Sequence, residues 1–165
     1  MLFRSARQYE PQRKEFKDAL ERAVKAGNNE AFLKDLAPFS WDIVCVVGGY
    51  NNPNQIVKHI TGETSKEVEN YANGENQWSF VFFEKKKLIS IFRYNIREID
   101  LAHADNECGS RHSGKLKIVP YGIALPIENH HLLDRHIIPS CPSSERNNNH
   151  CSFIFLGEKY DDQHP

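Results

Sequence analysis

Apolar residues at helical spacing mark the first ordered element of the chain. Pro11 suits the first turn of a helix, and the apolar positions after it recur at intervals of three and four residues. The stripe consists of Phe16, Ala19, Leu20, Ala23 and Val24. Gly27 and the two asparagines that follow it are typical of a helix end. The pattern therefore predicts a helix that begins at Pro11 and ends before Gly27, and a shorter helical segment over residues 30–36.

Dense apolar runs farther along the chain predict β-strands. Two of them, residues 78–84 and 88–94, flank the triplet Lys85-Lys86-Lys87, and this arrangement predicts a hairpin. The other predicted strands cover residues 41–47, residues 115–125 with an interruption near Pro120, and residues 153–156. Residues 103–114 are polar and rich in turn formers, so they are predicted to form a loop.

Helical segments thus come first in the chain, and strands follow. This order predicts an α+β fold in which N-terminal helices pack on one face of a mostly antiparallel sheet of about four to six strands. We expect residues 1–10 to form a flexible arm, residues 11–160 to form a single α+β domain, and residues 161–165 to form a tail.

The composition is that of a folded domain. Of 165 residues, 39% are hydrophobic and 26% are charged. Lysine and arginine together number 21 against 22 acidic residues, which leaves a net charge of −1. Because there is no excess of basic residues to hold a phosphate backbone, nucleic acid is not an expected partner. The longest apolar stretches fall short of the roughly 20 residues of a membrane helix, so no membrane span is expected.

Four cysteines permit three complete sets of disulfide pairs. Cys141 and Cys151 bracket a polar segment that has too few apolar groups to be ordered by burial. A disulfide between them, worth about 2–3 kcal/mol, is the candidate covalent link. Cys45 lies in an apolar run, where a buried thiol packs well. The alternative is that all four cysteines are reduced thiols of a cytoplasmic protein.

Eight histidines prompt a search for metal ligands. His103, Cys108 and His112 are spaced nearly as zinc ligands are and form a candidate metal site. The alternative is that these residues face water in a loop, and the spacing matches no established zinc framework, so no cofactor is expected. The chain contains no G-x-S-x-G motif and no cysteine nucleophile signature, so no catalytic residue is assigned.

Asp42 is an unusual residue for its position, because it lies between Trp41 and a run of five apolar residues. If that strand is buried, the carboxylate needs a partner such as Arg93, Arg97 or backbone N–H groups. We interpret Asp42 as a polar anchor where the chain enters the strand. The alternative is a binding role for Trp41, Asp42 and Tyr50.

The segment from residue 39 to residue 50 resembles small, largely uncharacterised bacterial exported or lipoprotein-like domains with a W-D-x-hydrophobic-C/Y motif. Trp41, Asp42, Cys45 and Tyr50 match this motif, and Gly49 stands where those domains usually have proline. A second apolar segment of such domains resembles residues 78–84. The resemblance covers roughly residues 12–95 and implies a location in the cell envelope without an established activity.

Together these features favour a non-enzymatic binding or interaction protein of the bacterial cell envelope, including an inhibitor or immunity-type protein that blocks a protein partner. Periplasmic location is the expectation, with a lipid anchor as an option if the natural N-terminus lies upstream. Two alternatives remain open at this point. One is a small metal-dependent or cysteine/histidine hydrolase, and the other is a cytoplasmic regulatory module that binds a small ligand.

Overall fold

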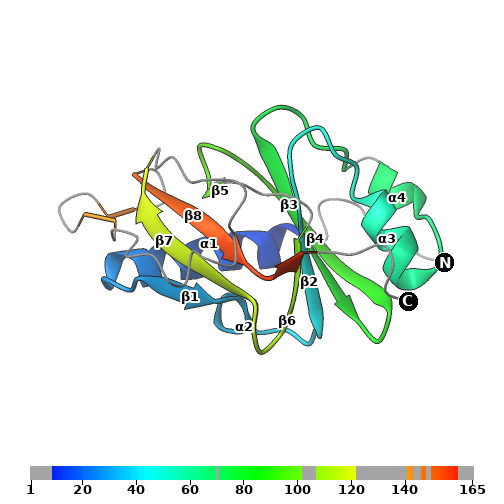
Figure 1. Ribbon diagram of the computed structural model, residues 1–165, viewed down its shortest axis with the longest axis horizontal. Helices are drawn as coiled ribbons and strands as arrows, with labels where there is room; N and C mark the ends of the chain where they lie inside the picture. The colour runs from blue at the N-terminus through cyan, green and yellow to red at the C-terminus, as the bar shows by residue number, and fades with distance from the viewer. Residues whose placement is uncertain are drawn as a thin grey trace.

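The computed structural model describes residues 9–69, 71–101, 107–121, 141–142, 146–147 and 150–159. Within these ranges the chain forms helices and two mostly antiparallel β-sheets, which confirms the predicted α+β class (Figure 1). The predictions for residues 1–8, 122–140 and 160–165 lie outside the described ranges, as does His103.

The helices are α1 (Glu10–Lys25), α2 (Leu33–Leu36), α3 (Asn54–Thr61) and α4 (Lys66–Glu69). The strands are β1 (Glu30–Phe32), β2 (Ile43–Val47), β3 (Gln77–Glu84), β4 (Lys87–Asn95), β5 (Asp100–Leu101), β6 (Glu107–Ser110), β7 (Lys115–Pro120), β8 (Cys151–Leu156) and β9 (Glu158–Lys159). The helix predicted after Pro11, the hairpin, and the strands within residues 41–47 and 153–156 are confirmed.

The larger sheet has the strand order β4-β3-β2-β6-β9, and all of its pairs are antiparallel. β2 lies in the middle of this sheet, and its residues from Val44 to Val47 are buried. Apolar, mostly β-branched residues fit a strand that is covered on both faces. The sequence therefore places its most continuous apolar run at the centre of the sheet.

The smaller sheet has the order β1-β7-β8-β5, in which only the β5–β8 pair is parallel. The prediction of one sheet is therefore wrong in this detail. β6 and β7 follow one another in the chain but belong to different sheets, and the turn between them carries the chain across (Figure 1). Alternation of polar and apolar residues predicts strands but does not reveal which strands pair.

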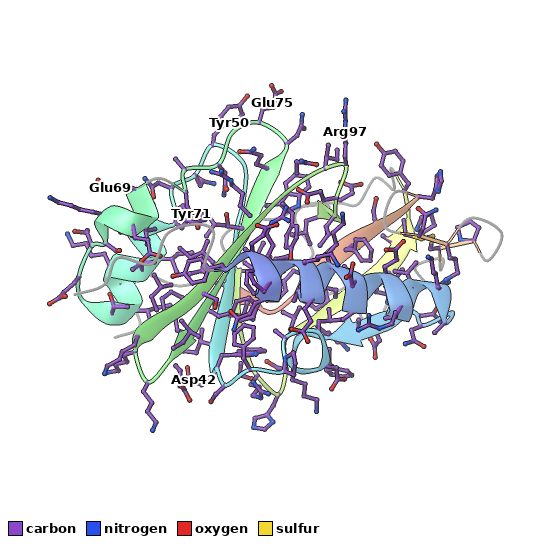
Figure 2. The ribbon with its side chains drawn as sticks, turned by 180° about the vertical axis from the view of Figure 1, so that it is seen from behind. Asp42, Tyr50, Glu69, Tyr71, Glu75 and Arg97 are labelled. Atoms are coloured by element: carbon purple, nitrogen blue, oxygen red, sulfur yellow. A yellow bond between two sulfur atoms is a disulfide. The ribbon has the colours of Figure 1, made fainter. Side chains whose placement is uncertain are left out.

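Helix α1 joins the two sheets into one core. Seen from behind, the blue helix crosses in front of both sheets (Figure 2). Phe16 is fully buried and touches an aromatic cluster of the larger sheet, with ring centroids 5.0–6.3 Å away. The rings of this cluster are those of Phe80, Phe82, Phe92 and Tyr94. The predicted apolar stripe of α1 is the face that packs on the strands.

Two local predictions are wrong. Residues 107–110 form β6 rather than part of a loop, because β2 offers them an edge to pair with and Cys45 stands directly opposite Cys108. Residues 30–32 form β1 rather than a helix, because they pair with β7. Both segments are short, so tertiary pairing outweighs their weak local preferences.

Helices α3 and α4 lie beside β4, at the end of the molecule away from the smaller sheet (Figure 1). Ile56 and Val57 of α3 and Val68 of α4 are buried. None of the helices in the described ranges has the length and hydrophobicity needed to cross a membrane.

The hairpin turn places two lysines in a backbone conformation that favours asparagine and glycine. Lys85 and Lys86 have φ angles of 49° and 62°, as in a type I′ turn, which favours Asn-Gly. The double substitution Lys85→Asn with Lys86→Gly is expected to raise the free energy of unfolding by about 1 kcal/mol. Urea denaturation measures this gain. Lys87→Gly is the control, because Lys87 lies in β4, and this variant is expected to lower stability. An unchanged midpoint for the turn variant would show that the positive φ angles of Lys85 and Lys86 cost the fold no stability.

Candidate functional site

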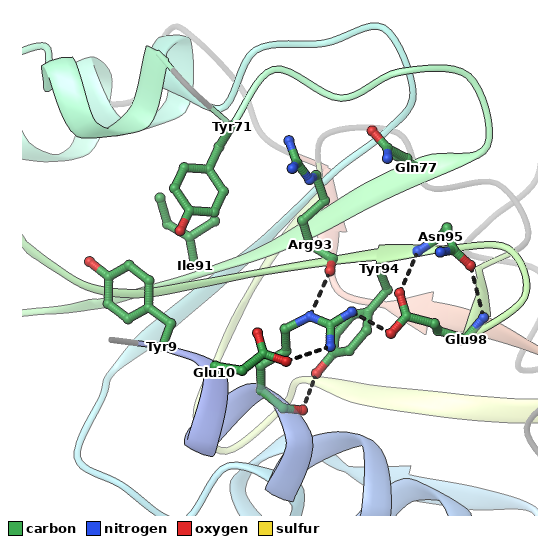
Figure 3. A pocket seen from close by; sticks show the side chains of 10 residues that line it. Tyr9, Glu10, Tyr71, Gln77, Ile91, Arg93, Tyr94, Asn95 and Glu98 are labelled. Carbon is green, nitrogen blue, oxygen red and sulfur yellow. Dashed lines mark hydrogen bonds and ion pairs between the residues drawn. The ribbon is translucent and has the colours of Figure 1, made fainter. Parts of the chain in front are cut away.

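A pocket of ≈ 330 Å³ opens where the first turn of α1 meets the edge strand β4 (Figure 3). Its lining is mostly polar and aromatic and comes from α1, from the two strands of the hairpin and from the segments that flank them. The lining residues are Tyr9, Glu10, Arg13, Tyr71, Gln77, Ile91, Arg93, Tyr94, Asn95 and Glu98. Pockets that hold small ligands occupy about 300–1,000 Å³, so this one is large enough for a small molecule.

Arg13 is the centre of the hydrogen-bond network in this pocket. Its Nε donates to the backbone oxygen of Arg93 at 2.9 Å. One terminal nitrogen pairs with Glu10 at 3.3 Å, and the other pairs with Glu98. The guanidinium carbon also lies 4.6 Å from the centroid of the Tyr94 ring. Because the Arg13 side chain is only 19% exposed and is held by several partners, it forms a fixed wall of the pocket.

Two tyrosine hydroxyl groups in the pocket stay protonated at neutral pH. Burial raises the pKa of Tyr94 far above its usual value, and its hydroxyl donates to the backbone oxygen of Arg13 at 2.6 Å. Burial also raises the pKa of Tyr71, and the carboxylate of Glu67 adds to this shift while Arg93 opposes it. These hydroxyl groups can therefore donate hydrogen bonds but do not act as bases near neutral pH.

Arg93 and Tyr71 form the opposite wall (Figure 3). The guanidinium carbon of Arg93 lies 5.6 Å from the centroid of the Tyr71 ring, and its Nη1 donates to the backbone oxygen of Ala72 at 3.4 Å. The Tyr9 ring meets the Tyr71 ring edge-on at 6.5 Å, and its hydroxyl donates to Glu67 at 2.8 Å. Stacking on a ring fixes the plane in which an arginine offers its N–H groups.

The pocket offers both hydrogen-bond donors and acceptors. Arg93 brings hydrogen-bond donors, and Glu10, whose side chain is 61% exposed, brings acceptors. Nucleophilic catalysis requires a nucleophile beside a base, and the described residues that line the pocket include no serine, cysteine, lysine or histidine. Among the residues that the structure describes, no three His, Cys, Asp or Glu side chains are grouped so that they could hold a metal ion.

The structure does not bring together in one site the three residues that the sequence suggested for binding, Trp41, Asp42 and Tyr50. Trp41 is 2% exposed, and its ring nitrogen donates to the backbone oxygen of Ala37 at 2.8 Å, so it is part of the core. Asp42 is exposed, and its Oδ2 accepts a hydrogen bond from the backbone N–H of Lys85 at 2.9 Å. Asp42 and Tyr50 lie at opposite ends of the larger sheet (Figure 2). Asp42 thus anchors the chain before β2 to the hairpin turn.

All four cysteines are paired. The predicted Cys141–Cys151 disulfide is confirmed. Cys45 is bonded to Cys108, which joins the neighbouring strands β2 and β6, so the interpretation of Cys45 as a buried thiol is wrong. The candidate metal site of His103, Cys108 and His112 loses its sulfur ligand, because a disulfide sulfur is not a thiolate. His112 is exposed in the turn after β6.

The sequence did not identify the residues of the pocket. Arg13 looks like a member of the solvated face of an amphipathic helix, and Arg93 is conspicuous only as a possible partner of Asp42. Arg13 meets Glu98 across 85 positions of sequence. Because the hairpin and α1 bring these residues together only in the folded chain, no local motif signals the site.

No protein-family model matches the chain, and neither a curated protein nor a solved structure is detectably similar to it.

Proposed function

We propose that the chain is a non-enzymatic binding protein of the bacterial cell envelope that holds a small polar ligand in the pocket between α1, β4 and Tyr71. The observation that carries the proposal is the pocket itself, whose charged side chains are held by ion pairs on one wall and by the Tyr71 ring on the other. A wall that is already ordered loses little conformational entropy when a ligand binds.

The envelope location is supported by the cysteines. Two disulfides that use all four cysteines are typical of proteins from oxidising compartments. The resemblance of the segment around Trp41 and Asp42 to bacterial exported domains points in the same direction. Within a bacterial cell, the compartment that meets this requirement is the envelope, and periplasmic location is the proposal.

The chemical class of the ligand follows from the groups that line the pocket. A guanidinium over an aromatic ring recognises a carboxylate or a hydroxyl-rich group. Glu10 accepts hydrogen bonds from hydroxyl or ammonium groups on the same molecule. A small molecule with both donors and acceptors, such as an amino acid or a sugar acid, therefore fits the pocket better than an apolar one.

Thermal unfolding with a panel of free amino acids, monosaccharides and sugar acids tests this proposal. A ligand at about 100 times its dissociation constant is expected to stabilise the wild-type protein by about 2.7 kcal/mol, which raises the melting temperature by several degrees. Arg93→Gln is expected to reduce this shift strongly, because it removes the guanidinium from Tyr71.

Arg97→Gln is the matched control, since Arg97 is an exposed arginine four residues away that does not line the pocket. This variant is expected to keep the full stabilisation. The proposal is wrong if no compound in the panel stabilises the wild-type protein, or if Arg93→Gln responds as the wild type does.

A further inference from the structure

Tyr50 is held away from the protein in a backbone conformation that tyrosine rarely adopts. Its φ is 63°, and the residue is 75% exposed. A left-handed conformation costs a residue with a side chain about 1–2 kcal/mol. None of the ring–ring or cation–ring contacts in the described part of the chain involves Tyr50. Backbone outliers of this kind gather at functional sites.

Asn73 fixes the loop that carries Tyr50. Its side-chain nitrogen donates to the backbone oxygens of Val47 and Gly48 at 3.0 and 3.1 Å. Its backbone N–H donates to the oxygen of Asn51 at 3.1 Å, and its side-chain oxygen accepts a hydrogen bond from Ser79 at 2.8 Å. Asn73 is 5% exposed. These buried contacts tie the loop after β2 to the loop before β3 and hold Tyr50 in its exposed position.

The second loop places a carboxylate beside the Tyr50 ring. Glu75 lies next to Tyr50 at this end of the molecule, and Arg97 stands apart from both (Figure 2). Desolvation of the hydroxyl, followed by the charge of Glu75 and a hydrogen bond to it, raises the pKa of Tyr50. Residues 48–54 and 72–77 contain no lysine or arginine, and Glu75 is their only charged residue. The tip of these two loops is therefore aromatic and acidic.

We propose that these two loops form a docking surface for a protein partner that presents a lysine or arginine side chain to Tyr50 and Glu75. The cation lies over the Tyr50 ring and pairs with the Glu75 carboxylate. A cation over an aromatic face is attracted by the ring, and tyrosine is a frequent anchor at protein interfaces because it buries a large rigid area. A fixed loop adds affinity because it needs no ordering on binding.

A selection with displayed peptides tests this surface. A random 12-residue peptide library is selected on the wild-type protein after depletion on Tyr50→Ala. The surviving peptides are expected to be enriched in lysine and arginine relative to the starting library. Their affinity is expected to fall at least tenfold on Glu75→Gln and to weaken as salt is raised, because the contact is partly electrostatic.

Tyr121→Ala is the matched control, because Tyr121 is the other exposed tyrosine among the described residues and is 59% exposed. The selected peptides are expected to bind this variant as they bind the wild type. Tyr50→Gly, which accommodates the positive φ, is expected to lose peptide binding while it remains folded. The proposal is overturned if no peptide distinguishes the wild type from Tyr50→Ala, or if the enriched peptides carry no excess of basic residues. Neither result bears on the pocket, which Arg93→Gln tests separately.

Discussion

Replacing Cys45 and Cys108 together by alanine is expected to lower the free energy of unfolding by about 4 kcal/mol. The disulfide closes a loop of 63 residues and joins β2 to β6 inside the larger sheet. Without it, the unfolded chain has a higher conformational entropy, which stabilises the unfolded state. The short polar strand β6 also loses its covalent attachment. Equilibrium denaturation in urea measures the effect.

The second disulfide provides the matched comparison. Cys141 and Cys151 are separated by 10 residues, so the corresponding double alanine variant is expected to lose about 3 kcal/mol. The order of the two losses is the informative result. A loss for the Cys45 and Cys108 variant that is no larger than this one would contradict the structural role given to the β2–β6 link.

Phe16→Ala is expected to cost about 3–5 kcal/mol, because it leaves a cavity at the centre of the aromatic cluster. Phe16 is fully buried between α1 and the larger sheet and contacts four aromatic rings. Its side chain is therefore a main contact between the helix and the strands. The midpoint of denaturation and the far-ultraviolet circular dichroism together show whether the fold is weakened or lost.

Lys14→Ala on the same helix is the control. The Lys14 side chain is 76% exposed and forms a surface ion pair with Asp18, so the loss is expected to stay within about 0.5 kcal/mol. A smaller change for Phe16→Leu than for Phe16→Ala is also expected, because leucine fills most of the volume. If Phe16→Ala were as mild as Lys14→Ala, α1 would not pack on the sheet as described.

The parts of the fold that could be predicted from the sequence are those with strong local patterns. The stripe of α1 has helical spacing, and β2, β3 and β4 are dense apolar runs. β6 could not be predicted, because a strand of Glu, Cys, Gly and Ser exists only through its partner β2. The division into two sheets depends on pairings between distant segments, which hydrophobic alternation does not encode.

The candidate site was harder to predict than the fold. Its residues are charged or aromatic side chains that also occur on any solvated helix face or sheet edge. Arg13 becomes distinctive only because Glu98 and the Arg93 backbone meet it from elsewhere in the chain. Tyr50, by contrast, was visible as a candidate in the sequence, but its positive φ and its neighbour Glu75 could be known only from the structure.

The proposed envelope location requires that the protein folds with both disulfides formed in an oxidising compartment. The most direct measurement is to alkylate free thiols at the moment of lysis in cells of the native host, and then to map the cysteines by mass spectrometry. The expected result is four unmodified cysteines and two disulfide-linked pairs of peptides, Cys45 with Cys108 and Cys141 with Cys151. Alkylation of all four cysteines would contradict it and would favour a reduced, cytoplasmic protein.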